Sequence, residues 1–332
     1  MVVRRLDAVQ RRNKGVGFVL AVFYKFVDDQ GGYLAALIAY YAFISLFPLL
    51  LLLTTGLGVV LAEHPSLQQR LVDSALGEFP IIGDQLGEPR RLSGGVAGVV
   101  IGVIGALYGG SGVGQAYQNA MNVMWSVPRN ERGNPLISRL RSLRLLVVLA
   151  LALAGTTLLS LLGNFVDGFG TLSTLGLAVA AVVINSFVFS LGYRIGTARG
   201  LSLREVLPGA AAMAVIWQLL QTFGAVYVGQ VVRHASATNS IFAVVLGLLA
   251  FLYLTSLAVV FTAEINSVRV QKLYPRALLT PFTDDVVLTR GDRRTYTAQA
   301  QAQRAKGFEQ IDVTFDRSAD TADDTGEPPE RR

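Results

Sequence analysis

Residues 33–62 read YLAALIAYYAFISLFPLLLLLTTGLGVVLA and contain no Asp, Glu, Lys or Arg. As a helix this stretch is about 45 Å long, whereas ~20 apolar residues suffice to cross a hydrocarbon core of ~30 Å. The stretch therefore predicts a helix that spans a membrane.

Five more uncharged segments of spanning length follow. Apolar residues make up 52% of the chain and charged residues only 16%, below the ~25% typical of soluble domains. Backbone amides in lipid must bond internally, which favours helices. The predicted fold class is all-α, a polytopic membrane protein with six transmembrane helices plus interfacial amphipathic helices. The predicted spans are Tyr33–Ala62, Ser93–Val127, Leu145–Val166, Gly168–Tyr193, Val206–Val232 and Ile241–Ala263.

The basic residues orient these spans. Cytoplasmic connections of membrane proteins carry an excess of Lys and Arg. With the N-terminus inside, the outside connections hold few of the 29 basic residues, namely Arg70, Arg90, Arg91 and Arg233. The sequence therefore predicts that both termini are cytoplasmic.

The ends of the chain differ from its middle. Residues 1–32 are predicted to form a cytoplasmic N-terminus with an interfacial helix over Val16–Val27, in which Lys14 and Lys25 face anionic headgroups. Residues 33–274 form the transmembrane domain. Residues 275–332 lack the apolar content for a core of their own and are predicted to be a polar, largely disordered cytoplasmic tail, with the disorder after about Arg317.

Two short helices outside the spans are also expected. One begins at Ser66, a plausible N-cap in the first outside connection, and would lie on the membrane surface. The other lies in the tail near Tyr296–Lys306.

Proline and glycine mark two of the spans. Pro48 removes a helical hydrogen bond, and Ser45, one turn earlier, is expected to satisfy part of the freed backbone; the kink is either fixed or a gate. Gly109 and Gly110 belong to a series of small residues that lets helices approach closely. Close packing and a hinge both fit this series.

Several amides lie within the predicted spans. Such side chains bond neighbouring helices at ~1 kcal/mol each, or they line a polar cavity, and both alternatives stay open. Gln115, Asn119 and Asn122 are spaced to share one face. The others are Asn164, Asn185, Gln218 and Gln221.

Glu264 is the one acid at the end of a span. It lies about 35 Å from the start of the last segment at ~1.5 Å per residue, so it is expected at the inner boundary, within reach of headgroup water. It is either an anchor, paired with an arginine from a cytoplasmic connection, or a functional group.

Other classes of protein lack their signatures. Cysteine is absent, which excludes disulfides and thiolate metal sites. The absence of mid-membrane charge disfavours a proton relay, a cation pump and a voltage sensor, and no phosphate-binding glycine loop indicates an ATPase. No catalytic, cofactor-binding or metal-binding residues are predicted, no cofactor is expected, and the protein is expected not to be an enzyme.

Four ordered motifs resemble the YihY/virulence factor BrkB family of bacterial inner-membrane proteins. Residues 39–49, AYYAFISLFPL, are similar to its first-span signature. Residues 120–125, AMNVMW, resemble its Asn-x-x-Trp stretch and include Asn122 and Trp125. Residues 208–210, PGA, match its entry to span five. Residues 262–266, TAEIN, resemble its closing Gly-Ala-Glu-x-Asn, with Thr262 in place of glycine, and include Glu264 and Asn266.

The resemblance implies six spans, cytoplasmic termini and a bacterial plasma membrane, and some members formerly carried the label ribonuclease BN. The leading hypothesis is a transporter or translocation component, not driven by ATP, for a lipid-like or amphiphilic envelope molecule. The alternative is a membrane scaffold in envelope biogenesis that binds envelope proteins, and a ribonuclease is the weakest reading. The expected partners are the bilayer, an amphiphilic substrate and envelope proteins, but not nucleic acid.

Overall fold

The computed structural model describes residues 7, 10–60, 95–134, 136–148, 171–234, 237–283 and 286–315. The predicted helix after Ser66, most of the predicted span Leu145–Val166, Asn164 and the tail from residue 316 lie outside the described residues.

The described part of the chain is helical and contains no strand. Residues 136–148 form one helical stretch. The named helices are α2 (Lys14–Asp28), α3 (Gly31–Val60), α6 (Gly95–Met124), α8 (Thr171–Gly196), α9 (Leu203–His234), α10 (Ala237–Gln271) and α11 (Arg290–Ala302).

Three helices in the described part are long and apolar enough to cross a membrane. Their qualifying segments are Ala178–Gly196, Leu203–Gly224 and Val245–Gln271, and a shorter apolar segment covers Gly31–Leu46 of α3. These segments overlap four of the six predicted spans and extend a few residues beyond them.

The outer faces of these helices are apolar. Val179, Val183 and Phe187 recur every fourth residue on α8, and each is more than half exposed. On α9, Leu219 and Phe223 are also more than half exposed. Contiguous apolar stripes of this kind are unfavourable in water, whereas lipid tails solvate them without cost. The exposure pattern therefore fits a helix bundle surrounded by lipid.

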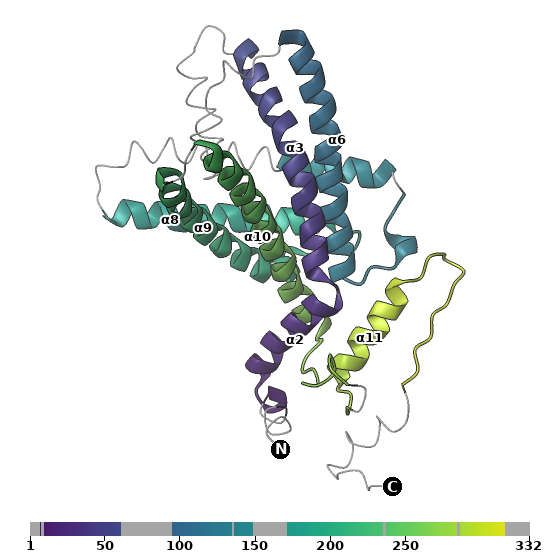
Figure 1. Ribbon diagram of the computed structural model, residues 1–332. Helices are drawn as coiled ribbons and strands as arrows, with labels where there is room; N and C mark the ends of the chain where they lie inside the picture. Colours follow the sequence, from purple (N-terminus) through teal and green to yellow (C-terminus); the bar gives the residue numbers. More distant parts are fainter. Residues whose placement is uncertain are drawn as a thin grey trace.

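The helices form two groups that meet at one end. Figure 1 shows α3 and α6 running antiparallel as one long pair, with α8, α9 and α10 beside them and α2 and α11 below. The buried core lies where the ends of α6, α8 and α10 meet the start of α9. It includes Met121, Met124, Trp125, Tyr193, Val206, Ala210, Val260 and Ala263.

Glycines bring α6 against its neighbours. A Cβ at Gly109 would lie 2.5 Å from Ser45 Cβ and 2.7 Å from Ser45 Cα, and one at Gly105 would lie 2.6 Å from Pro48 Cβ. Gly110 instead faces Leu146 in residues 136–148. These contacts fit the packing alternative, and a hinge at Gly109 and Gly110 stays a prediction. The Ser45 hydroxyl donates to the Ala42 carbonyl, so the expectation that it serves the backbone group freed by Pro48 is wrong.

Gly109→Ala is expected to lower the free energy of unfolding by about 1–3 kcal/mol, the usual cost of overpacking. Its new methyl group would meet the backbone of α3, which cannot turn away. Gly110→Ala should cost less, because its Cβ would lie 3.1 Å from the flexible end of Leu146. Thermal denaturation of both variants in detergent measures the difference, and equal midpoints would contradict this explanation.

Helix α2 begins at an Asn13 cap, whose side chain accepts from the backbone of Gly15 at 3.0 Å. Its inner face packs on α10 through Ala21 and Val22 against Val268. Phe23 and Val27 remain exposed, as expected of an amphipathic surface helix. Lys25 departs from the prediction, because its side chain is fully buried and does not face headgroups.

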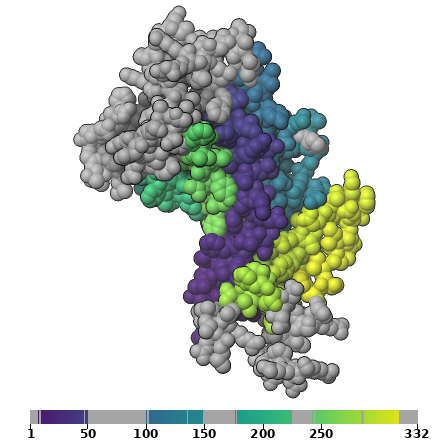
Figure 2. Space-filling view, in the orientation of Figure 1, coloured from purple at the N-terminus to yellow at the C-terminus, as the bar shows by residue number. Residues whose placement is uncertain are grey.

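The tail contains more structure than its composition indicates. Helix α11 begins at Arg290, before the predicted Tyr296–Lys306, because Thr289 and Asp292 form a reciprocal capping box. Arg276, only 1% exposed, pairs with Asp28 of α2 at 3.0 Å and with Asp292 of α11. Figure 2 shows α11 (yellow) packed beside the start of the chain (purple). Buried ion pairs therefore help to attach this part of the tail, together with a few buried apolar residues such as Ala277 and Ala302.

Candidate functional site

Three of the four sequence motifs, residues 120–125, 208–210 and 262–266, meet at the end of the bundle where α6 ends and α9 begins. Asn266 of α10 accepts a hydrogen bond from the Gly209 amide at 2.8 Å and donates one to the Val206 carbonyl at 2.9 Å. A Cβ at Gly209 would lie 2.2 Å from the Thr262 carbonyl oxygen. The glycine of one motif and the asparagine of another thus hold α9 and α10 in backbone contact.

Asn122 and Trp125 attach the end of α6 to the connection between α8 and α9. The side chain of Asn122 accepts a hydrogen bond from the Ala198 amide at 2.8 Å. The ring of Trp125 is buried, and the Arg199 guanidinium lies 5.8 Å from its centroid. Gln115 and Asn119 are exposed, so the expected three-amide face does not form one buried site.

Glu264 occupies a sealed charged cluster with Lys25 and Asp29. Each of the three side chains is at most 3% exposed. The Lys25 ammonium lies 3.7 Å from a Glu264 oxygen, bonds to Asp29, and donates to the Met124 carbonyl at 3.1 Å. Burial alone would lower the pKa of Lys25, but the carboxylates of Asp29 and Glu264 outweigh it and raise that pKa above its ordinary value.

This cluster corrects two expectations about Glu264. Its carboxyl group does not reach headgroup water, because it is 0% exposed, and its cationic partner is Lys25 of α2 instead of an arginine. Neither of its oxygens accepts a hydrogen bond within the described structure. The reason is geometric. The length of the last span places Glu264 at the inner boundary of the membrane, but α2 lies across the end of α10 and covers that position.

Sequence reasoning missed Lys25 and Arg276 as buried partners. The run Lys25–Asp29 offered a signal, because a lysine and an acid four residues apart share a helix face. Ser267, which donates to the Met124 carbonyl at 2.6 Å, gave no comparable signal. Arg276 gave none either, since its two acidic partners come from distant segments.

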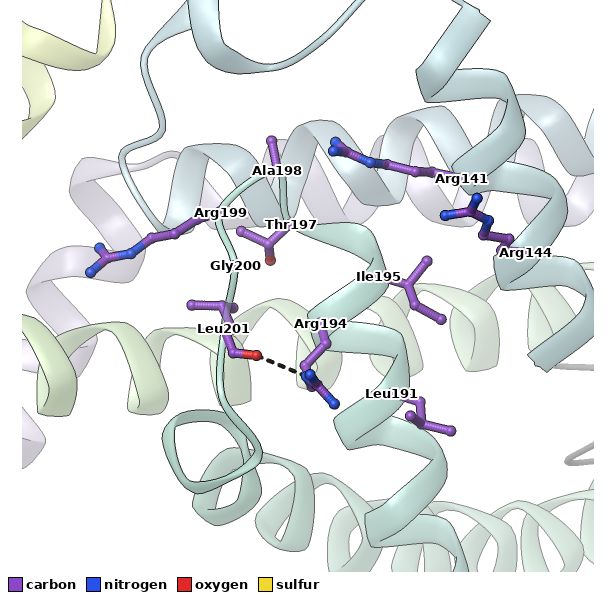
Figure 3. Close-up of a pocket in the computed structure, with 10 residues that line it drawn as sticks. All are labelled: Arg141, Arg144, Leu191, Arg194, Ile195, Thr197, Ala198, Arg199, Gly200 and Leu201. Carbon is purple, nitrogen blue, oxygen red and sulfur yellow. Dashed lines mark hydrogen bonds between the residues drawn. The ribbon is translucent and has the colours of Figure 1, made fainter.

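A pocket of about 440 Å³ lies beside this junction (Figure 3). It is bordered by residues 136–148, the end of α8 and the connection to α9. Arg194, at the end of α8, bonds the far end of that connection, because its Nε donates a hydrogen bond to the Leu201 carbonyl oxygen at 2.8 Å. None of the described lining residues is acidic. The lining residues are Arg141, Arg144, Leu191, Arg194, Ile195, Thr197, Ala198, Arg199, Gly200 and Leu201.

The remaining predicted residues lie apart from this pocket. Pro48, Gly109 and Gly110 belong to the contacts of α3 and α6 described above. Asn185 is buried on α8, whereas Gln218 and Gln221 are half-buried on α9. None of these amides lines the pocket, and whether they form a cavity elsewhere stays a prediction. Within the described segments, no group of three His, Asp or Glu side chains could hold a metal ion.

Comparison with known proteins gives a family match. The sequence model of the family "Virulence factor BrkB" matches residues 22–281, which include all four motifs. The chain is 26% identical over 274 residues to the "Putative ribonuclease-like protein YfkH" of Bacillus subtilis (strain 168), covering 76% of this chain and 94% of that protein. No solved structure matches the chain.

Proposed function

Because the chain belongs to the BrkB virulence factor family and is an integral membrane protein with apolar helices, we propose that it is a transporter or translocation component. Its cargo is a lipid-like or amphiphilic envelope molecule, and ATP does not drive it. The protein crosses the bacterial plasma membrane six times and keeps both termini in the cytoplasm. The excess of basic residues in the connections assigned to the inside supports this orientation.

The single observation that carries this proposal is the sealed Glu264 carboxyl group on α10. An ionisable side chain buried in a membrane helix is costly to keep, and in membrane proteins such groups mark the paths of ions and substrates. Lys25 offsets its charge from a different helix, so a change in the charge of Glu264 would alter the contact of α2 with α10. A group of this kind can couple a conformational change to an ion gradient.

An amphiphilic cargo is supported by the pocket of Figure 3 and the helices beside it. The arginine-lined pocket opens beside helices whose outer faces are apolar over several turns. A molecule with a charged head and a hydrocarbon body would match both surfaces.

Reconstitution tests the proposed transport. Vesicles with the protein should move a fluorescent phospholipid across the bilayer faster than protein-free vesicles, as measured by quenching of the outer leaflet. Glu264→Gln should slow that movement, whereas Glu309→Gln should not, because the described hydrogen bonds of Glu309 stay within the tail. Equal rates for wild type, Glu264→Gln and empty vesicles would remove the proposal for that lipid.

A scaffold is the alternative, favoured by the docking of the tail. Arg304 binds Glu131 at 2.8 Å, and Gln299 binds Asp29 at 2.9 Å, so the tail has fixed contacts. Deleting residues 281–332 would also remove Asp292, the partner of buried Arg276. This region would then unfold whether the protein is a scaffold or a transporter, so that deletion does not separate the two. Deletion of 316–332 leaves every described contact in place; transport should survive it, whereas binding of envelope proteins through this end would be lost.

The ribonuclease-like name of the relative defines the weakest candidate, and we propose that this chain is not an enzyme. The described acidic side chains do not gather into a site for the metal ions that many phosphodiesterases use. RNA hydrolysis that copurifies with the detergent-solubilised protein and disappears in Glu264→Gln would overturn this view.

A further inference from the structure

Three of the four arginines that line the pocket in Figure 3 come from two helices. Arg141 and Arg144 project from residues 136–148, and Arg194 comes from α8. Arg199 points away from them in the view, in keeping with its position near the ring of Trp125. Of the four arginines that line the pocket, Arg141, Arg144 and Arg194 are therefore the ones that are not placed over an aromatic ring.

These arginines lack acidic partners in the described structure. No described ion pair or hydrogen bond involves Arg141 or Arg144, and the described bond of Arg194 uses Nε, so its two Nη groups are not engaged by it. Arg141 and Arg144 are three residues apart on one helix, where like charges repel. Like charges held together without a counterion favour the binding of an anion.

The ligand chemistry follows from the number and type of these groups. Guanidinium groups bind phosphate oxygens through two parallel hydrogen bonds, and they do so better than lysine. A phosphate monoester carries about −1.5 to −2 charges at neutral pH, which suits three arginines better than a singly charged carboxylate does. Apolar Leu191 and Ile195 in the same lining would contact the part of the ligand next to its head.

We propose that this pocket binds the phosphate monoester head of an anionic amphiphile. The proposal names the cargo class of the transport proposed above and rests on it for the role of the ligand, but the site itself is tested by binding alone. Basic pockets between helices at the membrane edge are a known type of lipid-headgroup site. Arginines that only orient the protein in the bilayer would need no pocket.

Binding to the full-length protein in a neutral detergent distinguishes these possibilities. The probes are dihexanoyl phosphatidic acid, inorganic phosphate and dihexanoyl phosphatidylcholine, measured by microscale thermophoresis. Phosphatidic acid should bind tightest and inorganic phosphate should compete weakly. Phosphatidylcholine should not compete. The double variant Arg141→Gln/Arg144→Gln should weaken phosphatidic acid binding by about tenfold or more, since it removes two charge-assisted contacts.

Arg139→Gln is the matched control. Arg139 lies exposed on the same helical stretch but does not line the pocket. The affinity of the Arg139→Gln variant for phosphatidic acid should therefore stay within about twofold of the wild-type value. An equal loss in both variants would show a general effect of surface charge and would overturn the site. Equal affinity for inorganic phosphate and phosphatidic acid would contradict the proposal that the ligand is an amphiphile, and the pocket would then be a site for soluble phosphate.

The binding and transport experiments fail separately. Wild-type binding with no transbilayer movement in vesicles would contradict the proposed transport and leave the phosphate site intact. Unchanged binding by the double variant, whose thermal midpoint should match wild type, would refute the phosphate site and leave transport unaffected.

Discussion

Lys25→Met is expected to lower the free energy of unfolding by about 3–5 kcal/mol, the usual cost of removing one partner from a buried ion pair. Without the ammonium, the carboxyl groups of Asp29 and Glu264 would share a sealed space with no cation. The Met124 carbonyl would also lose its donor on Lys25. Methionine keeps most of the unbranched apolar chain of lysine, so the change removes mainly the ammonium group with its charge and its hydrogen bonds.

The measurement is the thermal midpoint and the folded fraction of the protein in detergent. Lys14→Met is the matched control, because Lys14 lies on the same helix and is exposed; it should behave as wild type. Adding Asp29→Asn and Glu264→Gln to Lys25→Met should recover much of the loss, because the whole set of buried charges is then neutral. If the Lys25→Met and Lys14→Met variants have the same thermal midpoint, the cluster of Lys25, Asp29 and Glu264 does not hold α2 on α10.

Gly209→Ala should destabilise the protein by about 3 kcal/mol or more, since two costs add. The new Cβ would lie 2.2 Å from the Thr262 carbonyl oxygen and 2.4 Å from Asn266 Nδ2, which forces α9 and α10 apart. Their separation would then break the two hydrogen bonds of Asn266, whose buried groups would lose their partners.

Gly176→Ala, on helix α8, is the control for Gly209→Ala on helix α9. No described atom lies within 4 Å of a Cβ at that position, and alanine favours a helix over glycine by up to ~1 kcal/mol. This variant should therefore melt at or slightly above the wild-type midpoint. Loss of folded protein in both variants would mean that any added methyl group disturbs the bundle, and the close contact at Gly209 would lose its special role.

The sequence motifs contain residues that make buried hydrogen bonds between helices, but they did not predict the partners of those residues. Gly209 and Asn266, which are 57 residues apart, were each singled out by resemblance, but only the structure shows that one bonds the other. Asn122 was expected to share a face with Asn119 and instead bonds the backbone at Ala198. An amide can bond any backbone group within reach, and sequence spacing fixes its direction on one helix without fixing its partner.

The tail shows that composition, like helix spacing, does not predict which distant residues pair. Few apolar residues follow Pro275, and a core-based argument predicts disorder. Arg276, Asp28 and Asp292 supply buried ion pairs instead, and their three positions are far enough apart in the chain that no local pattern joins them. The helix begins at Arg290 instead of near Tyr296 because the capping box of Thr289 and Asp292 lies before the segment that was predicted to be helical.

The sequence by itself determined that the protein is helical, that it lies in a membrane and which family it belongs to. These properties depend on the hydropathy and length of single segments and on short ordered motifs, all of which are local. Only the tertiary structure decided that Lys25 pairs with Glu264, that Arg276 joins α2 to α11, and that Arg141, Arg144 and Arg194 border one pocket. Such pairings depend on how separate helices cross, and the energy that selects one crossing is distributed over contacts between distant parts of the chain.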